Sequence, residues 1–150
     1  MIVVLSSDIS YNLDQFAKKL AVNLGAVYRP LNDDFLLKNT GFFEEPKHGK
    51  IIFSGHVIAS RLKVPAIKIF LQESQESINN RIAKEEGCSL EDAKVKHLEL
   101  LKKEKERMLK LFGVDLQNKN VYDLIIRIDN LNQKALMYVL EKYIAKRSEN

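Results

Sequence analysis

The residues best placed to do chemistry lie at positions 6–15 (SSDISYNLDQ), between a β-branched run and a stretch with helical spacing. A strand, turn and helix with this spacing are typical of the phosphate-binding loop G-x-x-x-x-G-K-[ST]. There, glycine backbone N–H groups, a lysine and a hydroxyl hold a nucleotide phosphate. On that pattern the two glycines, the lysine and the hydroxyl are replaced, in this order, by Ser7, Asn12, Leu13 and Asp14. The turn therefore has the position of a phosphate site but lacks its chemical groups.

Two carboxylates make this turn unfavourable for a nucleotide. Asp8 and Asp14 bring negative charge to a site that would have to attract a triphosphate, and like charges at about 4 Å repel by roughly 1–4 kcal/mol. Leu13 falls in phase with the apolar positions of the following helix, so a place in the core accounts for it. The hydroxyls of Ser7 and Ser10, with the N–H groups at the helix start, remain as donors for a small anion.

Metal and thiol chemistry have little support in the sequence. The histidines His48, His56 and His97 have no neighbours at metal-ligand spacing, so no metal site is predicted. Cys88 follows a glycine and two glutamates, which do not favour a reactive thiolate, and we expect a structural thiol. We therefore expect no cofactor.

A basic segment is the other feature with a possible function. Seven basic residues fall within 17 positions: Lys94, Lys96, Lys102, Lys103, Lys105, Arg107 and Lys110. Glu99 with Lys103 and Glu106 with Lys110 have the spacing of helical ion pairs, each worth about 0.2–0.5 kcal/mol, which favours a solvated helix face. The alternative is a surface that contacts the phosphate backbone of a nucleic acid. Both interpretations stay open.

The composition predicts one globular domain over residues 1–150. The chain is 45% hydrophobic and 29% charged, with a net charge of +4 that permits a nucleic-acid partner without requiring one. One cysteine excludes an internal disulfide, and no uncharged apolar run approaches the roughly 20 residues of a membrane helix. We expect a soluble, cytoplasmic protein with no membrane partner.

The order of elements predicts an α/β fold. Apolar runs of strand length fall at residues 2–5, 26–29, 50–54, 66–71 and 122–128. Helical spacing and capping signals fall at residues 12–24, 73–86, 89–111 and 132–145, with one helical turn near Phe35. Strands that alternate with helices predict a parallel sheet covered on both faces, with ligands at the carboxyl ends of its strands.

Three segments give the chain a resemblance to a known family. They are FAKKLAVNLG at residues 16–25, RIAKEEGCSLEDA at 81–93, and FGVDL with NVYDLIIRID over 112–129. These segments resemble archaeal-type cytidylate kinases, which are small P-loop nucleoside monophosphate kinases, and the likeness extends over nearly the whole chain. It implies a three-layer sandwich with a five-stranded parallel sheet, in which residues 89–111 form a lid-like helix.

The resemblance also implies functional positions, and the chain departs from most of them. The family's substrate-binding insertion after the second strand is reduced to residues 36–50, and its E-G-R after the third strand reads Ser54-Gly55-His56. In the lid helix, two arginine positions hold Leu100 and Lys105, whereas Arg107 is retained. Phosphoryl transfer depends on positioning and on neutralisation of charge by such groups, so we expect a pseudo-kinase rather than an enzyme.

Three functional hypotheses follow. The first is a non-catalytic cytidylate kinase-like protein that binds structured RNA, a ribosomal particle or another protein. The second is a regulatory pseudo-kinase that still holds a nucleotide or anion. Its vestigial pocket would comprise Ser7, Ser10, Asn12, Leu13, Asp14 and His56. The third is a divergent active cytidylate kinase.

Overall fold

The computed structural model describes residues 1–8, 11–38, 49–129 and 131–149. In these residues it contains a five-stranded sheet of order β2-β3-β1-β4-β5 in which all neighbours are parallel. The strands are β1 (Ile2–Ser7), β2 (Val27–Arg29), β3 (Ile51–Ser54), β4 (Ile67–Gln72) and β5 (Leu124–Arg127). The predicted five-stranded parallel sheet is confirmed.

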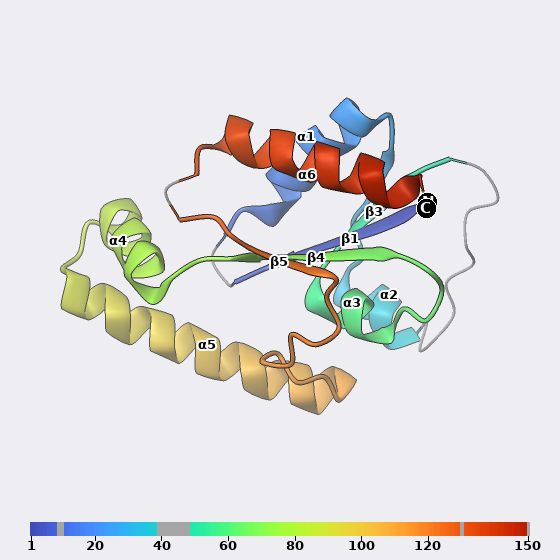
Figure 1. The fold of residues 1–150 in the computed structure, drawn as a ribbon. Helices are drawn as coiled ribbons and strands as arrows, with labels where there is room; N and C mark the ends of the chain where they lie inside the picture. The colour runs from blue at the N-terminus through green and yellow to red at the C-terminus, as the bar shows by residue number, and fades with distance from the viewer. Residues whose placement is uncertain (9–10, 39–48, 130, 150) are drawn as a thin grey trace.

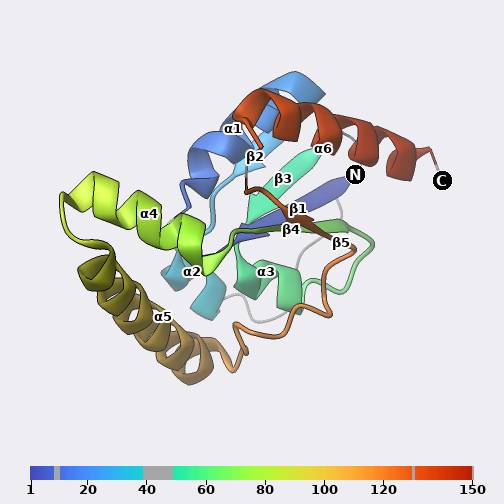
Figure 2. The same cartoon turned by 60° about the vertical axis from the view of Figure 1, so that its left-hand side comes forward.

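Helices cover both faces of the sheet (Figures 1 and 2). On one face lie α1 (Leu13–Leu24) and α6 (Gln133–Ser148), and on the other lies α3 (His56–Arg61). The three layers of the predicted sandwich are therefore present.

Strand β1 is buried on both sides. Val3 and Leu5 belong to the core cluster beneath α1 and α6, whereas Ile2 and Val4 belong to the cluster beneath α3. Successive side chains of a strand point to opposite faces, so an uninterrupted apolar run suits a central strand of a covered sheet.

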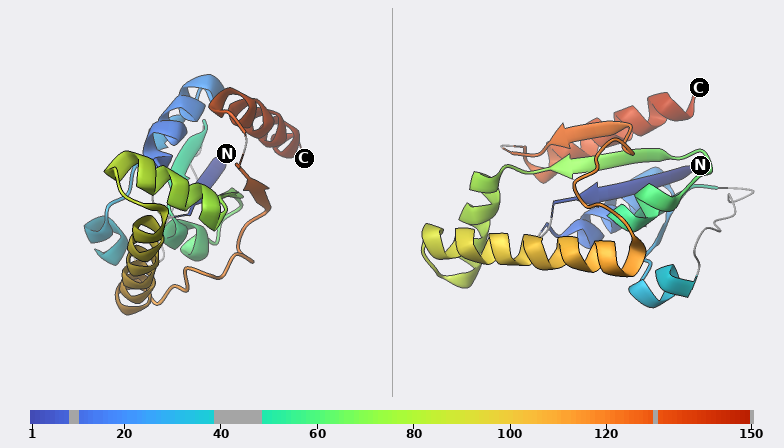
Figure 3. Two further views of the ribbon diagram at one scale, coloured as in Figure 1. Left: turned by 90° about the vertical axis from the view of Figure 1, so that its left-hand side faces the viewer. Right: turned by 90° about the horizontal axis from the view of Figure 1, so that it is seen from below.

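Helix α4 (Gln75–Glu86) and the start of α5 (Leu90–Phe112) lie beyond the carboxyl ends of the strands, and α5 then runs back along the α3 side of the sheet (Figures 1 and 3). The start of α5 packs on α4 through Ala93, and its end packs on α2 (Asp33–Lys38) and α3 through Phe112. Ser89 caps α5 and Gly113, at φ 66°, ends it, which confirms the predicted long helix. No helix in the described residues is both long and apolar enough to cross a membrane.

The sequence does not predict α3. This helix has only six residues, too few to display a helical period. It starts at Gly55, whose φ of 121° lies in a region that side chains other than glycine rarely adopt. Val57, Ile58 and Ala59 are buried, so tertiary packing rather than local pattern forms the helix.

Candidate functional site

The turn after β1 lies at the carboxyl edge of the sheet, where the sequence predicts it. Its polar groups serve the local backbone: the Ser7 hydroxyl donates to the Asp8 carbonyl at 3.1 Å, and Asn12 caps α1 by accepting the Gln15 N–H at 3.4 Å. Leu13 is half-buried against the core cluster beneath α1. Ser10, like His48, lies outside the described residues.

Asp14 is the centre of a hydrogen-bonded group that joins α1, β2 and β3. Its carboxylate accepts the hydroxyl of Tyr28 and, at 3.4 Å, that of Ser54. The hydroxyls of Tyr28 and Ser54 are 2.9 Å apart. Burial and the Asp14 carboxylate raise the pKa of Tyr28 to about 12, so the phenol stays protonated as a donor. The carboxylate is thus engaged by the protein's own side chains.

Asp8, at the start of the turn, links it to the residues that follow β4 and to Lys119. It accepts the backbone N–H of Glu73 at 2.6 Å, which links the end of β1 to the end of β4, and its second oxygen lies 3.7 Å from the Lys119 ammonium. The same ammonium lies 4.0 Å from the centre of the Phe70 ring. Asp8 therefore fixes the sheet edge and is partly neutralised there.

His56 is a packing residue on the other face of the sheet. Its Nδ1 is 2.5 Å from the Tyr122 hydroxyl and its Nε2 is 2.9 Å from the Asp115 carbonyl oxygen. A carbonyl can only accept, so Nε2 carries the proton and Nδ1 accepts from Tyr122. Burial lowers the pKa of His56, which keeps the ring neutral. The structure thus separates His56 from the Asp14 group instead of joining them in one pocket.

Sequence reasoning misses Tyr28, Tyr122 and Lys119. Fourteen residues separate Tyr28 from Asp14, and 66 separate Tyr122 from His56. No motif spacing marks such pairs. The only available signal is that Tyr28 and Ser54 stand at or near the ends of parallel strands, which meet at one edge.

The seven basic residues of α5 lie in two rows rather than one. With 3.6 residues per turn, one row follows the Phe112 edge of the buried stripe and the other follows its Ala93 edge. One side carries Lys94, Lys102 and Lys105; the other carries Lys96, Lys103, Arg107 and Lys110.

Two basic residues of the second group, Lys96 and Arg107, form ion pairs. The Lys96 ammonium lies 2.5 Å from a Glu86 carboxylate oxygen. Arg107 contacts Asp33 at 2.5 Å and Glu104 at 2.7 Å. Arg107 therefore ties α5 to α2, and the carboxylates around it reduce the positive charge on this side of the helix.

A cavity of about 280 Å³ lies between α5 and the carboxyl ends of β1 and β4. Its polar lining is Ser7, Asp8, Gln117 and Lys119, and its apolar lining is Phe70, Leu101 and Leu116. Among the residues that the structure describes, no group of three His, Cys, Asp or Glu side chains is arranged to hold a metal ion. The cavity thus offers one ammonium, one carboxylate and a few hydrogen-bonding groups to a small ligand.

Sequence comparison relates the chain to archaeal enzymes, although no protein-family profile matches it. The cytidylate kinase of Thermococcus kodakarensis is 36% identical over 83 residues, or 55% of this chain and 43% of that protein. The cytidylate kinase of Pyrococcus horikoshii is 29% identical over 101 residues, which are 67% of this chain and 53% of that protein. The chain is cytidylate kinase-like. It spans about half the length of the curated relatives that it matches.

A solved structure supports the fold of this cytidylate kinase-like chain. An uncharacterized protein from Eubacterium ventriosum superposes with a TM-score of 0.69, over 97% of this chain and 98% of that one. The two sequences are 15% identical, so the likeness concerns the fold alone.

The neutral state of His56 predicts how the stability of the cytidylate kinase-like chain depends on pH. Its pKa is lowered in the folded protein, so the unfolded chain binds the extra proton first as the pH falls below about 6.5. The free energy of unfolding, measured by urea denaturation, should fall from neutral pH towards pH values of about 5.5. In His56→Gln the fall should be shallower, whereas exposed Lys63→Gln should keep the original slope. Equal slopes in all three proteins would contradict a neutral buried His56.

Proposed function

We propose that this chain is a non-catalytic cytidylate kinase-like protein of the cytoplasm that binds structured RNA, alone or within a ribosomal particle. The proposed loss of catalysis depends on the hydrogen-bonded group of Asp14, Tyr28 and Ser54. The resemblance assigns the phosphate-binding hydroxyl to position 14 and the acid of E-G-R to position 54. In this chain Asp14 and Ser54 hold these two positions, and both form hydrogen bonds with side chains of the protein itself.

The electrostatics of the turn support the same conclusion. Transfer of a phosphoryl group needs backbone donors, cations and magnesium around the developing charge. Position 13 holds a half-buried leucine instead of the lysine, and position 14 holds a carboxylate. Two cations lie near the turn, and both have partners: Lys119 faces Asp8 and the Phe70 ring, and Arg81 pairs with Glu73.

The RNA half of the proposal depends on one side of α5. Lys94 and Lys102 are exposed and Lys105 is half-buried, and none of the three forms an ion pair within the described residues. Lysines without carboxylate partners can replace the counterions of a phosphate backbone, which is the dominant source of affinity for nucleic acids. The exposed leucines Leu98 and Leu109 lie on the same side and add apolar contact area.

Absence of catalysis is tested with ATP and CMP in a coupled assay. We expect the purified chain to form no more ADP than a mock purification from cells without it, because the phosphate-binding groups are missing. Tyr28→Phe and Lys119→Gln should leave this background unchanged. Turnover above the mock level that changes in either variant would belong to the chain and would contradict the proposal.

RNA binding is tested by fluorescence anisotropy with a labelled structured RNA over a range of salt concentrations. In Lys102→Gln/Lys105→Gln, affinity at low salt should drop and the slope of log K against log[salt] should decrease by about 2, one for each lost contact. The matched control is Lys103→Gln/Lys110→Gln on the other side of α5, where Glu99 and Glu106 stand four residues before the lysines and offset their charge, so binding should change less. No binding at low salt, or equal losses in both variants, would refute this surface.

The cavity between α5 and β1 favours a second candidate, a regulatory protein that binds a small anion or nucleotide. Its volume is about 280 Å³, and its wall carries the Lys119 ammonium, which an anion would have to draw away from the Asp8 carboxylate. Calorimetry with ATP, CMP, CTP and inorganic phosphate at millimolar concentration is expected to give heat that disappears in Lys119→Gln. Absence of heat with the unmodified chain would eliminate this candidate without affecting the RNA proposal.

A further inference from the structure

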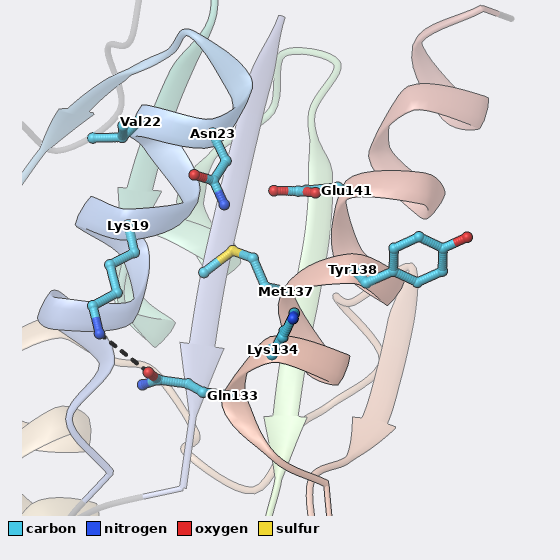
Figure 4. A pocket seen from close by; sticks show the side chains of 8 residues that line it. All are labelled: Lys19, Val22, Asn23, Gln133, Lys134, Met137, Tyr138 and Glu141. Atoms are coloured by element: carbon cyan, nitrogen blue, oxygen red, sulfur yellow. Dashed lines mark hydrogen bonds between the residues drawn. The ribbon is translucent and has the colours of Figure 1, made fainter.

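The outer face of the α1/α6 layer has an open groove of about 650 Å³ between the two helices (Figure 4). Lys19 of α1 donates a hydrogen bond to Gln133 of α6 at 3.2 Å across one end of the groove. Figure 4 shows the Met137 side chain pointing between the helices, with Glu141 extending from α6 on the same side. The groove lies on the opposite side of the sheet from α3 and is separate from the turn after β1.

Large apolar side chains border this groove in contact with solvent. Val22 is 80% exposed and Tyr138 is 62% exposed. Such residues at a groove with a charged rim are typical of protein interfaces, where an apolar centre is surrounded by polar groups.

Two charges of α6, Lys134 and Glu141, lie at equal distances along the helix from the apolar centre, and a third, the Lys142 ammonium, lies 5.5 Å from the centre of the Tyr138 ring. Lys134 precedes Met137 by three residues, and Glu141 follows Tyr138 by three residues. Lys134, Tyr138 and Glu141 lie at i, i+4 and i+7, so they share one face of the helix. If a second α6 runs antiparallel across this face, the lysine of each copy meets the glutamate of the other, and the two apolar pairs meet at the centre.

We propose that the occupant of this face is a second copy of the chain, bound through an antiparallel, two-fold symmetric pairing of α6 with α6. Such an isologous interface requires a surface that is complementary to itself. A lysine and a glutamate equidistant from an apolar centre meet that requirement, and each dimer gains two opposite-charge contacts. The proposal is independent of the RNA and catalytic proposals, since it uses the other side of the sheet.

Sedimentation equilibrium of the full chain tests the pairing. The unmodified protein should shift from 17.3 kDa towards twice that mass as its concentration rises. Lys134→Glu and Glu141→Lys should each weaken the dimer about tenfold, because each places like charges together twice. The double variant Lys134→Glu/Glu141→Lys exchanges the charges and should restore the original dissociation constant. Tyr138→Ala should weaken the dimer about tenfold through loss of the aromatic contact.

Two controls keep the outcome decisive. Lys84→Glu makes the same charge change on exposed α4 and should leave the dimer unchanged. Circular dichroism should show the same helix content for all variants, since the substituted side chains are not in the buried core. A monomer at every concentration, a dimer indifferent to these substitutions, or a double variant as weak as the single ones would each overturn the proposal.

Discussion

Strand β1 pairs with β3 on one side and β4 on the other, and its residues from Ile2 to Ser6 are buried. All positions of the candidate site depend on this strand, because parallel neighbours deliver their next residues to the same edge. The turn after β1 therefore meets Ser54 at the end of β3 and Glu73 after β4. The hydrogen bond from the Glu73 N–H to Asp8 is a direct product of that geometry.

At this edge the protein satisfies its polar groups internally. A loop that binds phosphate keeps several N–H groups and a cation available to the ligand. Here Asn12, Asp14 and Ser7 are hydrogen-bonded within the chain, and Lys119 is held by Asp8 and the Phe70 ring. A charged group at a partly buried site is stable only with such partners, so the same contacts that hold the turn together compete with a ligand.

The two proposed surfaces lie on different sides of the molecule. α5 is held mainly by its ends, through Ala93 against α4 and Phe112 near α2 and α3, and only three of its 23 residues are buried. The lysines of α5 therefore face solvent. Helix α6 lies on the opposite side of the sheet, and its charged face also points to solvent (Figure 1). A dimer formed through α6 would carry two α5 surfaces, and two linked sites bind a long nucleic acid more tightly than one.

The sequence alone determined the alternation of strands and helices, the two-sided burial of β1, the caps of α1 and α5, and the position of the turn at the sheet edge. These features depend on periodicity, on residue types and on neighbours within a few positions, all of which are visible along the chain. The sequence also predicts at which positions the chain departs from the family that it resembles, since that needs only a position-by-position comparison.

Tertiary structure alone decided the partners of the replaced residues. Asp14 with Tyr28, and His56 with Tyr122 on the opposite face, are joined by strand order and not by spacing. Helix α3 exists because Val57, Ile58 and Ala59 find a sheet face to cover. The division of the α5 lysines into two sides depends on which stripe of the helix the body buries. Long-range pairing and burial set these features, and a linear pattern does not contain them.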